Sequence, residues 1–496
     1  MYIIIHTYMS TTISKPRKAH PDKPIKQSSV PAQDSSCRFA LTTALSIPAL
    51  LRKFISLFPR KSLALWLGDK VFYGRGFTPL ITLWCMVFQH LSGKSTMADV
   101  LEYVGKEGAD RLSPKGKPLS KTILSESTSS WSDARARLPV GAVHKALGTS
   151  GHAIREAVQN RLWHGMEPVL LDGTTLRARP FGDIAQEFPP HRSGKSSCPY
   201  WCLARSVVAF CMATSVVLDC VIGPTKRSEQ AMVLEMLMLS LWKNAIFVAD
   251  RNFGVYSVVR GALHAKAHIL VRLTDSRAKK LAREANVKLE EGLDQVIQWK
   301  PTSHDQCPEP LTKEPLTGRL IALQVQPKGF RAFTLYLFTT LVDAQITVQE
   351  LARFYGQRWQ VELNLRHVKT QMGLEFLDCK SADMVRKLWL TGLLAYNLVQ
   401  AAMSMAAACA NISILSLSFS RCLKALHSWL ENSDNMVSVK AWKNLLCRMA
   451  RFTLPKRSKP RPSEPRSIRY YKRDFPKLVG DRAAAREKLA LANSKS

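Results

Sequence analysis

The chain has 496 residues, of which 46% are hydrophobic and 8% aromatic; this is enough apolar material for a sizeable core and excludes wholesale disorder. Its 71 Lys and Arg against 38 Asp and Glu leave a formal net charge of +33, which predicts a polyanionic partner. The 11 cysteines have irregular spacings that form no disulfide framework, so a reducing, cytoplasmic compartment is expected.

The N-terminal part of the chain is predicted to be a basic arm followed by a helical domain. Residues 1–48 are rich in Lys, Pro and Ser and show no sustained apolar period, which is typical of a flexible arm. In residues 49–150 the apolar side chains recur at spacings of three and four, as in a helix with one buried face. We therefore expect an all-helical domain there.

Residues 160–274 are predicted to form the first part of an α/β core. Val169 to Leu171 make a short buried strand that we expect to stop at a turn, Asp172-Gly173. A hairpin is expected over 203–222, followed by a helix over 229–242 and a strand over 246–249 that ends at Asp250. A further helix and strand, over 255–265 and 268–273, complete the alternation of an α/β core.

The second half of the chain divides into three predicted parts. Residues 275–341 break the helix and strand rhythm and are expected to form a β-rich insertion. Residues 342–450 resume the core with a long helix from about Thr347 past Lys369, and residues 451–496 form a basic tail. The uncharged run 388–419 is long enough to cross a membrane, but polar residues interrupt it, so we interpret it as a buried helix.

Three carboxylates are candidates for chemistry. Asp172 and Asp250 each follow a predicted strand, and Glu362 lies on the long helix. Three such groups on one scaffold can hold two hard divalent cations, which suits phosphodiester chemistry. Each aspartate alone is more often a turn former or a helix cap.

The helix around Glu362 strengthens this hypothesis. At 100° per residue, one stripe carries a tyrosine, three cations and the glutamate, next to an apolar face; the stripe is Tyr355, Arg358, Glu362, Arg366 and Lys369. A solvated helix with a Glu to Arg pair at i,i+4 explains only two of these residues. Cations around a metal-binding acid suit a phosphate ligand.

With these spacings the chain resembles the DDE transposases of the insertion sequence four group, whose hallmark is Tyr, two residues, Arg, three, Glu, six, Lys. Tyr355, Arg358, Glu362 and Lys369 match every interval. The first aspartate matches within Val169-Leu-Leu-Asp-Gly-Thr-Thr and the second within Ile246-Phe-Val-Ala-Asp-Arg-Asn. The resemblance covers about residues 60–480, although the stretch after the first aspartate departs from the usual pattern.

The resemblance implies a ribonuclease H-like catalytic core, interrupted by the β-rich insertion and preceded by a helical DNA-binding domain. It implies that Asp172, Asp250 and Glu362 bind two Mg²⁺ ions, for which Mn²⁺ can substitute. The residues expected to contact DNA are Tyr355, Arg358 and Lys369, with Arg366, Arg251, Asn252 and Trp299 as further candidates. Trp299 would stack on an extruded base, although a lone tryptophan in a β-rich insertion is more often a core residue.

The function implied is cut-and-paste transposition. Such an enzyme binds the terminal inverted repeats of its element, cleaves the DNA by metal-dependent hydrolysis and joins the 3′ ends to target DNA. The helical domain, with Arg135 and Arg137, is expected to recognise the repeats. It would act as a dimer on double-stranded DNA, in the nucleoid of a bacterial cytoplasm and without a membrane. The alternatives are an inactive transposase that only binds DNA and a nuclease of the same fold.

Overall fold

The computed structural model describes residues 66–67, 76–93, 96–107, 109–113, 118–123, 127–158, 161–190, 201–238, 242–325, 333–430, 438–455, 481, 484 and 487. The predicted basic arm lies outside these residues, and so does most of the predicted basic tail.

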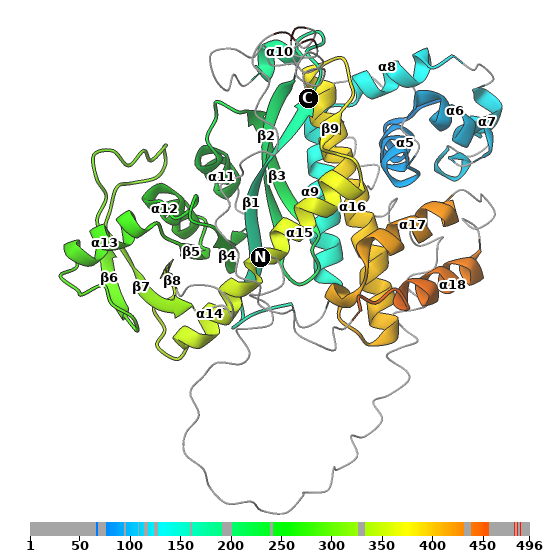
Figure 1. Ribbon diagram of the computed structural model, residues 1–496. Coiled ribbons are helices and arrows are strands. Elements are labelled where there is room, and N and C mark those ends of the chain that lie inside the picture. The colour runs from blue at the N-terminus through cyan, green and yellow to red at the C-terminus, as the bar shows by residue number, and fades with distance from the viewer. Residues whose placement is uncertain are drawn as a thin grey trace, which may run out of the picture.

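A nine-stranded mixed sheet forms the centre of the described chain, with the strand order β3-β2-β1-β4-β5-β8-β7-β6 and with β9 pairing with β1 (Figure 1). β1 is antiparallel to β2 and parallel to β4, and β4 is parallel to β5. The strands are β1 (Glu167–Ala178), β2 (Cys202–Cys211), β3 (Val217–Pro224), β4 (Ala245–Ala249), β5 (His268–Arg272), β6 (Asp294–Trp299), β7 (Leu316–Val325), β8 (Phe333–Thr339) and β9 (Phe376–Leu377). The predicted α/β class is confirmed as a mixed α/β fold.

The first strand differs from the prediction, because β1 does not stop at Asp172-Gly173. It continues to Ala178, and its pairing with β2 is unbroken from Val169 to Ala178. The expected turn was wrong because Thr174 and Thr175 are β-branched and favour a strand, so the glycine is carried through it. Asp172 therefore lies in the middle of a central strand instead of at its end.

Helices cover both faces of the sheet (Figure 1). On one face, α11 (Glu229–Leu237) and α12 (Tyr256–His264) pack on side chains such as Leu171 of β1. On the other face, α14 (Val348–Gly356), α15 (Gln360–Arg366) and α16 (Ala382–Ala410) pack on side chains such as Leu170. Successive residues of β1 thus face different layers, as the period of two requires.

The predicted insertion is an extension of the same sheet. It holds the strands β6, β7 and β8, of which β8 pairs with β5. It also holds a helix, α13 (Asp275–Glu284), which together with β6 was not predicted. α13 is strongly polar and has a narrow apolar stripe, so its periodicity is easily missed in sequence.

Trp299 ends β6 in the core of this extension. Its side chain is 5% exposed, and its ring packs edge-on against Tyr256 and Phe338. Neither face of the indole is open to a nucleobase, so the structure corrects the stacking role and supports the core alternative. The ring is buried because its neighbours are two aromatic side chains of the sheet and of α12.

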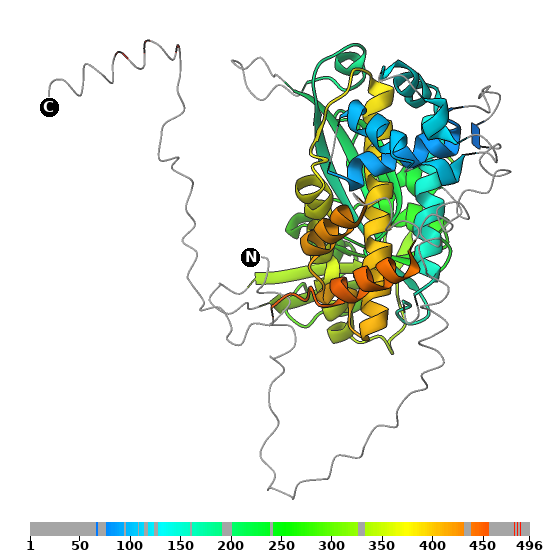
Figure 2. The ribbon, with the colours of Figure 1, turned by 90° about the vertical axis from the view of Figure 1, so that its right-hand side faces the viewer.

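The N-terminal part of the described chain is helical and shares a hydrophobic core with the helices after the sheet. The helices are α5 (Pro79–Leu91), α6 (Met97–Gly105), α7 (Leu119–Thr122), α8 (Ser129–Arg137) and α9 (Val140–Glu156), with a 3₁₀ turn, η1 (Asp110–Leu112). Figure 2 shows α16 running the length of the molecule, with α5 beside its upper part and α17 (Phe419–Leu430) and α18 (Val439–Ala450) across its lower part. Two short elements lie between larger ones: α10 (Ile184–Glu187) lies between β1 and β2 in the chain, and η5 (Ile414–Ser416) lies between α16 and α17.

α16 contains residues 388–410 of the predicted uncharged run; it begins earlier, at Ala382, and the rest of the run lies after its end. It is the one helix in the described part of the chain that is long and apolar enough to cross a membrane, and 67% of its most apolar window is buried in the protein. Asn397, at its centre, accepts a hydrogen bond from the Val217 N–H at 2.7 Å and donates to the Val217 carbonyl at 2.8 Å. Thr391 and Gln400 also hydrogen-bond to protein groups, the Lys387 carbonyl and the Tyr396 hydroxyl, as expected for a buried helix.

Candidate active site

Asp172 and Asp250 lie on neighbouring strands and on the same face of the sheet. Leu170 of β1 pairs in parallel register with Val248 of β4, and each aspartate follows its strand partner by two residues. A step of two residues returns to the same face, so both carboxylates belong to the layer of α15. Asp172 also accepts a hydrogen bond from the Gly173 N–H at 2.8 Å, which fixes its rotamer.

Glu362 is brought over β1 by a nearly continuous helical segment. The segment begins with a capping box between Thr347 and Glu350 and runs through α14, a 3₁₀ turn η3 (Gln357–Trp359), α15 and a π-helical turn η4 (His367–Gln371). This confirms the predicted long helix from Thr347. The Thr-x-x-Glu pattern explains the sharp start, because each side chain satisfies a backbone N–H of the other.

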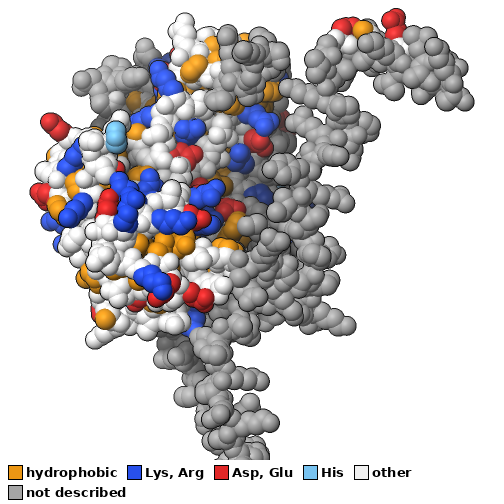
Figure 3. All heavy atoms as spheres, turned by 60° about the vertical axis from the view of Figure 1, so that its left-hand side comes forward, with side chains coloured by type: hydrophobic (Ala, Val, Ile, Leu, Met, Phe, Trp, Pro, Cys, Tyr) orange, Lys and Arg blue, Asp and Glu red, His pale blue; other side chains and the backbone are white. Residues whose placement is uncertain are grey.

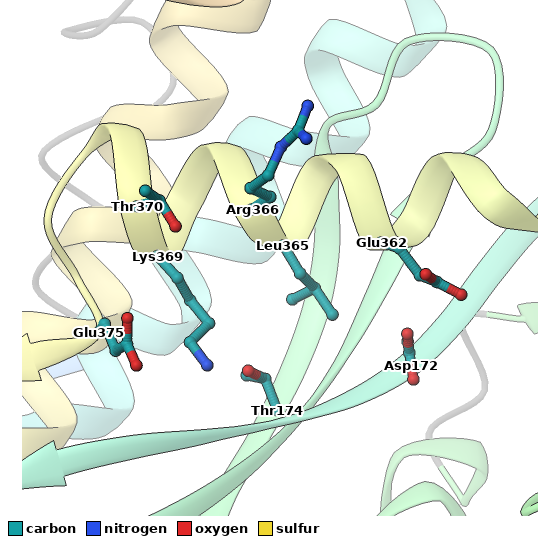
Figure 4. Close-up of a pocket in the computed structure, with 8 residues that line it drawn as sticks. All are labelled: Asp172, Thr174, Glu362, Leu365, Arg366, Lys369, Thr370 and Glu375. Atoms are coloured by element: carbon teal, nitrogen blue, oxygen red, sulfur yellow. The ribbon is translucent and has the colours of Figure 1, made fainter. Parts of the chain in front are cut away.

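A cavity of about 300 Å³ lies between β1 and this helix. It is lined by Asp172, Thr174, Glu362, Leu365, Arg366, Lys369, Thr370 and Glu375. Figure 4 shows the Asp172 and Glu362 side chains pointing toward one another at one end of the cavity. The strand and the helix therefore bring Asp172 and Glu362 to one end of the cavity. The register of β1 and β4 places Asp250 next to Asp172.

The pKa of Asp172 is raised to about 7. Burial is the largest cause, and the nearby carboxylates of Asp250 and Glu362 add to it, whereas the Gly173 N–H and Arg358 oppose it. Asp172 thus meets two other acids at a distance where like charges repel. A bound cation would relieve this repulsion.

Arg358 binds Glu362 instead of facing solvent. Its Nη2 donates to Glu362 Oε1 at 2.8 Å, and its guanidinium packs over the Trp359 ring at 5.0 Å. Burial lowers the pKa of Arg358, but Tyr355, Glu362 and Asp172 together raise it above its ordinary value. A phosphate contact by Arg358 would require this ion pair to open.

Tyr355 is also buried, with 8% of its surface exposed. Burial raises the pKa of its phenol to about 12, against the opposing influence of Arg358 and Arg272. The hydroxyl is therefore neutral at physiological pH, and the ring packs in the core below the helix. Its predicted DNA contact stays a prediction.

The two remaining cations of the helix point in different directions. Figure 4 shows Lys369 turned into the cavity toward Thr174, whereas Arg366 extends from the other side of the helix. Arg366 is exposed and Lys369 half-buried. Both residues line the cavity, and Lys369 is the one whose side chain points into it.

The residues after Asp250 have a different environment from the one expected. Arg251 is exposed, consistent with a DNA contact. Asn252 is exposed as well, but both ends of its amide are engaged: Nδ2 donates to Glu229 Oε2 at 2.5 Å, and Oδ1 accepts from Gln230 at 2.7 Å. A DNA contact by Asn252 would have to break these bonds, so the structure assigns it to protein contacts instead.

Sequence reasoning missed Glu229. Its carboxylate packs on Gly173, on the face of β1 opposite to Asp172. Its position just after the N-cap Ser228 is where any helix favours an acid, so the sequence offers no signal for this role.

Arg135 is a further correction. The residue is 8% exposed, and its guanidinium lies over Trp131 and donates to the sulfur of Met97 at 3.0 Å. It is buried because α8 packs beside α5 and α6, so it holds helices together instead of meeting DNA. Arg137 is exposed, and its predicted DNA contact stays a prediction.

The donor set fits a hard divalent cation, since carboxylate oxygens are the ligands that Mg²⁺ prefers. In the described part of the chain no three His, Cys, Asp or Glu side chains stand close enough to hold a metal ion in this conformation. Glu362 is paired with Arg358, at 2.8 Å between Oε1 and Nη2. The fit therefore rests on the chemistry of the acids and the repulsion at Asp172.

Lys and Arg side chains form a band with interspersed acids across the face seen in Figure 3. Exposed cations also occur on α13 and after it, namely Lys279, Lys280, Arg283, Lys288 and Lys300. These cations thus lie on the surface of the described chain, where they can bind a polyanion.

A family match and a relative in sequence agree with the resemblance found in the sequence. Residues 163–398 match the family described as the transposase DDE domain. The chain is similar to the transposase InsG for insertion sequence element IS4 of Escherichia coli (strain K12), with 24% identity over 330 residues, which are 64% of this chain and 68% of that protein. A cryo-EM structure of the piggyBac transposase synaptic complex with hairpin DNA aligns over 90% of this chain and 92% of that chain, at 11% identity and a TM-score of 0.40.

Proposed function

Because the chain belongs to the DDE transposases of the insertion sequence four group, we propose that it binds the ends of an insertion sequence, cleaves the DNA and joins its 3′ ends to target DNA. The observation that carries this proposal is the cavity where Asp172 and Glu362 face each other, next to Asp250 and Lys369. These side chains come from parts of the chain that are far apart in sequence: β1, the end of β4 and the helical segment with α15.

The core of this enzyme is ribonuclease H-like in our proposal. The supporting observation is the sheet order β3-β2-β1-β4-β5, with β1, β2 and β3 antiparallel and β4 and β5 parallel to β1. The strands β6 to β8 extend this sheet at its far edge. In this arrangement the segment 275–341 separates Asp250 from Glu362 in sequence while leaving them close in space.

Asp172, Asp250 and Glu362 would hold two Mg²⁺ ions. When bound, the ions polarise the phosphodiester and support both the attacking and the leaving oxygen. Asp172 must be deprotonated for this, and its raised pKa links metal binding to release of a proton. The hydrogen bond from Arg358 to Glu362 must open, or be shared, when Glu362 binds a metal ion. The Arg358 guanidinium would then lie beside the DNA phosphates and offset part of their charge.

Lys369 and Arg366 would contact the DNA backbone near the cavity, and Arg251 would do so beside Asp250. The exposed cations of the surface and the basic ends of the chain add non-specific, salt-dependent attraction. We propose that the helical region with Arg137 contacts the terminal repeats, and that two copies of the chain bring two ends together. Double-stranded DNA is thus the partner at every step.

Cleavage of a DNA carrying the end sequence of the element tests this function. With Mg²⁺, the wild type should cleave and Glu362→Gln should not, because the amide removes one of the three anionic ligands. Glu284→Gln is the matched control, since Glu284 pairs with Lys280 at i,i+4 as Glu362 pairs with Arg358. Equal cleavage by the wild type and Glu362→Gln would refute the proposal.

A strand-transfer assay separates a transposase from a nuclease of the same fold. Pre-cleaved ends with free 3′ hydroxyls are incubated with target plasmid and Mg²⁺. Joined products support transposition. Cleavage of the uncut substrate without any joining would identify a nuclease, and binding without either reaction would identify an inactive DNA-binding relative.

A further inference from the structure

We propose that Glu229 is a positioning residue that holds the strand of Asp172 and the loop of Asp250 together from the back of the sheet; the inference rests on the proposed function. Glu229 begins α11, on the face of the sheet opposite to the cavity. The structure shows no hydrogen bond between Glu229 and the side chain of Asp172 or Asp250. The influence of Glu229 therefore passes through the backbone of β1 and through Asn252.

The first contact is with β1. The carboxyl of Glu229 lies so close to Gly173 that a Cβ at this position would overlap it. Gly173 follows Asp172 and donates its N–H to the Asp172 carboxylate at 2.8 Å. The peptide that orients Asp172 is thus covered by Glu229, and glycine is required for this close approach.

The second contact is with the loop after β4. Glu229 Oε2 accepts from Asn252 Nδ2 at 2.5 Å, and Gln230 donates to the Asn252 carbonyl at 2.9 Å. The N–H of Asn252 in turn donates to Asp250 Oδ1 at 2.9 Å. The first turn of α11 therefore holds Asn252, and Asn252 in turn orients the Asp250 carboxylate.

The remaining contact of Glu229, with Arg205, is weaker than its hydrogen bond to Asn252. Its side chain is 23% exposed, and its nearest cation, Arg205 Nε, stands 3.9 Å from Oε1. An ion pair this long and this open to solvent adds little stability. The short bond to the Asn252 amide is the stronger link, and it needs an acceptor oxygen but no negative charge.

This difference allows a sharp test. Glu229→Gln keeps an acceptor for Asn252 and removes the charge, whereas Glu229→Ala removes both. Because residues that orient metal ligands typically change affinity or activity by about 10- to 100-fold, Glu229→Ala should weaken binding of Mn²⁺ by about that factor. Binding is measured on the full chain without DNA, from the EPR signal of free Mn²⁺. Glu229→Gln should stay within about threefold of the wild type.

Gly173→Ala gives a second, independent perturbation. The added methyl should push Glu229 away although its carboxylate is intact, and weaken Mn²⁺ binding as Glu229→Ala does. In the double variant, Gly173→Ala should add little, because the two changes act on one contact. Glu235→Ala on the same helix is the control, since Glu235 pairs only with Arg227 among the described residues, and it should bind Mn²⁺ as the wild type does.

Three results would overturn the inference: wild-type Mn²⁺ binding by Glu229→Ala, equal weakening by Glu229→Gln and Glu229→Ala, or additive losses in the double variant. The second would show that the charge, and not the hydrogen bond, matters. Melting temperatures check that each variant folds. The Mn²⁺ measurement does not depend on DNA cleavage, so a failure of the tether is distinguishable from a failure of the proposed transposase activity.

Discussion

Replacing Asp172 by asparagine should make the protein more stable while abolishing cleavage. The structure places this carboxylate beside two other acids and buries it, so its charged form is unfavourable when no cation is bound. Asparagine has nearly the same shape and can still accept the Gly173 N–H. The substitution thus removes the repulsion and keeps the local hydrogen bond.

The magnitude follows from the pKa. A tenfold change in a dissociation constant is worth about 1.4 kcal/mol, so raising the pKa of Asp172 from 3.8 to about 7 costs at most about 4 kcal/mol. Because the side chain keeps some contact with solvent, we expect about 2 kcal/mol.

The sign depends on pH. The folded state binds the proton more tightly than the unfolded state, so the free energy of unfolding falls as pH rises from 3.8 to about 7 and is level above this range. Asp172→Asn should therefore match the wild type near pH 4 and exceed it at about pH 8.

Urea unfolding in EDTA, followed by circular dichroism, measures this difference. Added Mg²⁺ should stabilise the wild type more than Asp172→Asn, because only the wild type retains the full set of anionic ligands. Asp219→Asn should shift stability in the opposite direction, since Asp219 is buried and accepts from His144 at 2.6 Å. If Asp172→Asn is no more stable than the wild type near pH 8 without divalent ions, the reasoning about the three acids is wrong.

Three further predictions concern the scaffold. The hydrogen bond to Asp219 on β3 raises the pKa of His144, so the stabilisation by this pair is complete below about pH 6.5 and is lost as pH rises past the raised pKa. The melting temperatures of His144→Ala and the wild type should therefore differ less at high pH than at low pH. Arg319 is buried, binds Asp294 with two nitrogens and donates to two carbonyls before α14, so Arg319→Met should lower the free energy of unfolding in urea by about 3 kcal/mol; an unchanged urea midpoint would contradict this. Gly151 packs on a β3 carbonyl that a methyl would overlap, so Gly151→Ala should destabilise by about 1–3 kcal/mol in thermal unfolding, whereas Gly141→Ala on the same helix meets no neighbour and should not.

Much of the fold was predictable because its signals are local. The capping pair of Thr347 and Glu350 marks the start of the long helix, and the apolar runs of β4 and β5 mark buried parallel strands. The spacing within the long helix placed Glu362 and Lys369 on the side that lines the cavity. The partners of Tyr355 and Arg358 were not predictable, because the burial of these two residues depends on the sheet beneath the helix.

The DNA contacts that were wrongly expected share one physical cause, which is that the partners of a side chain are set by the tertiary structure. Trp299 and Arg135 have side chains that suit DNA contacts, but each is enclosed by elements from distant parts of the sequence. Asn252 is exposed and still committed to α11. No periodicity within a strand or helix reports such contacts.

The stretch Asp172-Gly173 shows why the misread turn matters for function. As the end of a strand, the glycine would only shape a turn, and nothing would need to lie on it. Within β1, however, the alternation of side chains places Asp172 toward the cavity and Gly173 toward α11, so one peptide belongs to both faces of the sheet. A change at the back of the sheet can then alter the geometry of a carboxylate at the front without touching it. The strand interior thus connects Glu229 to the proposed metal ligands, and a loop at this position would be too compliant to do so.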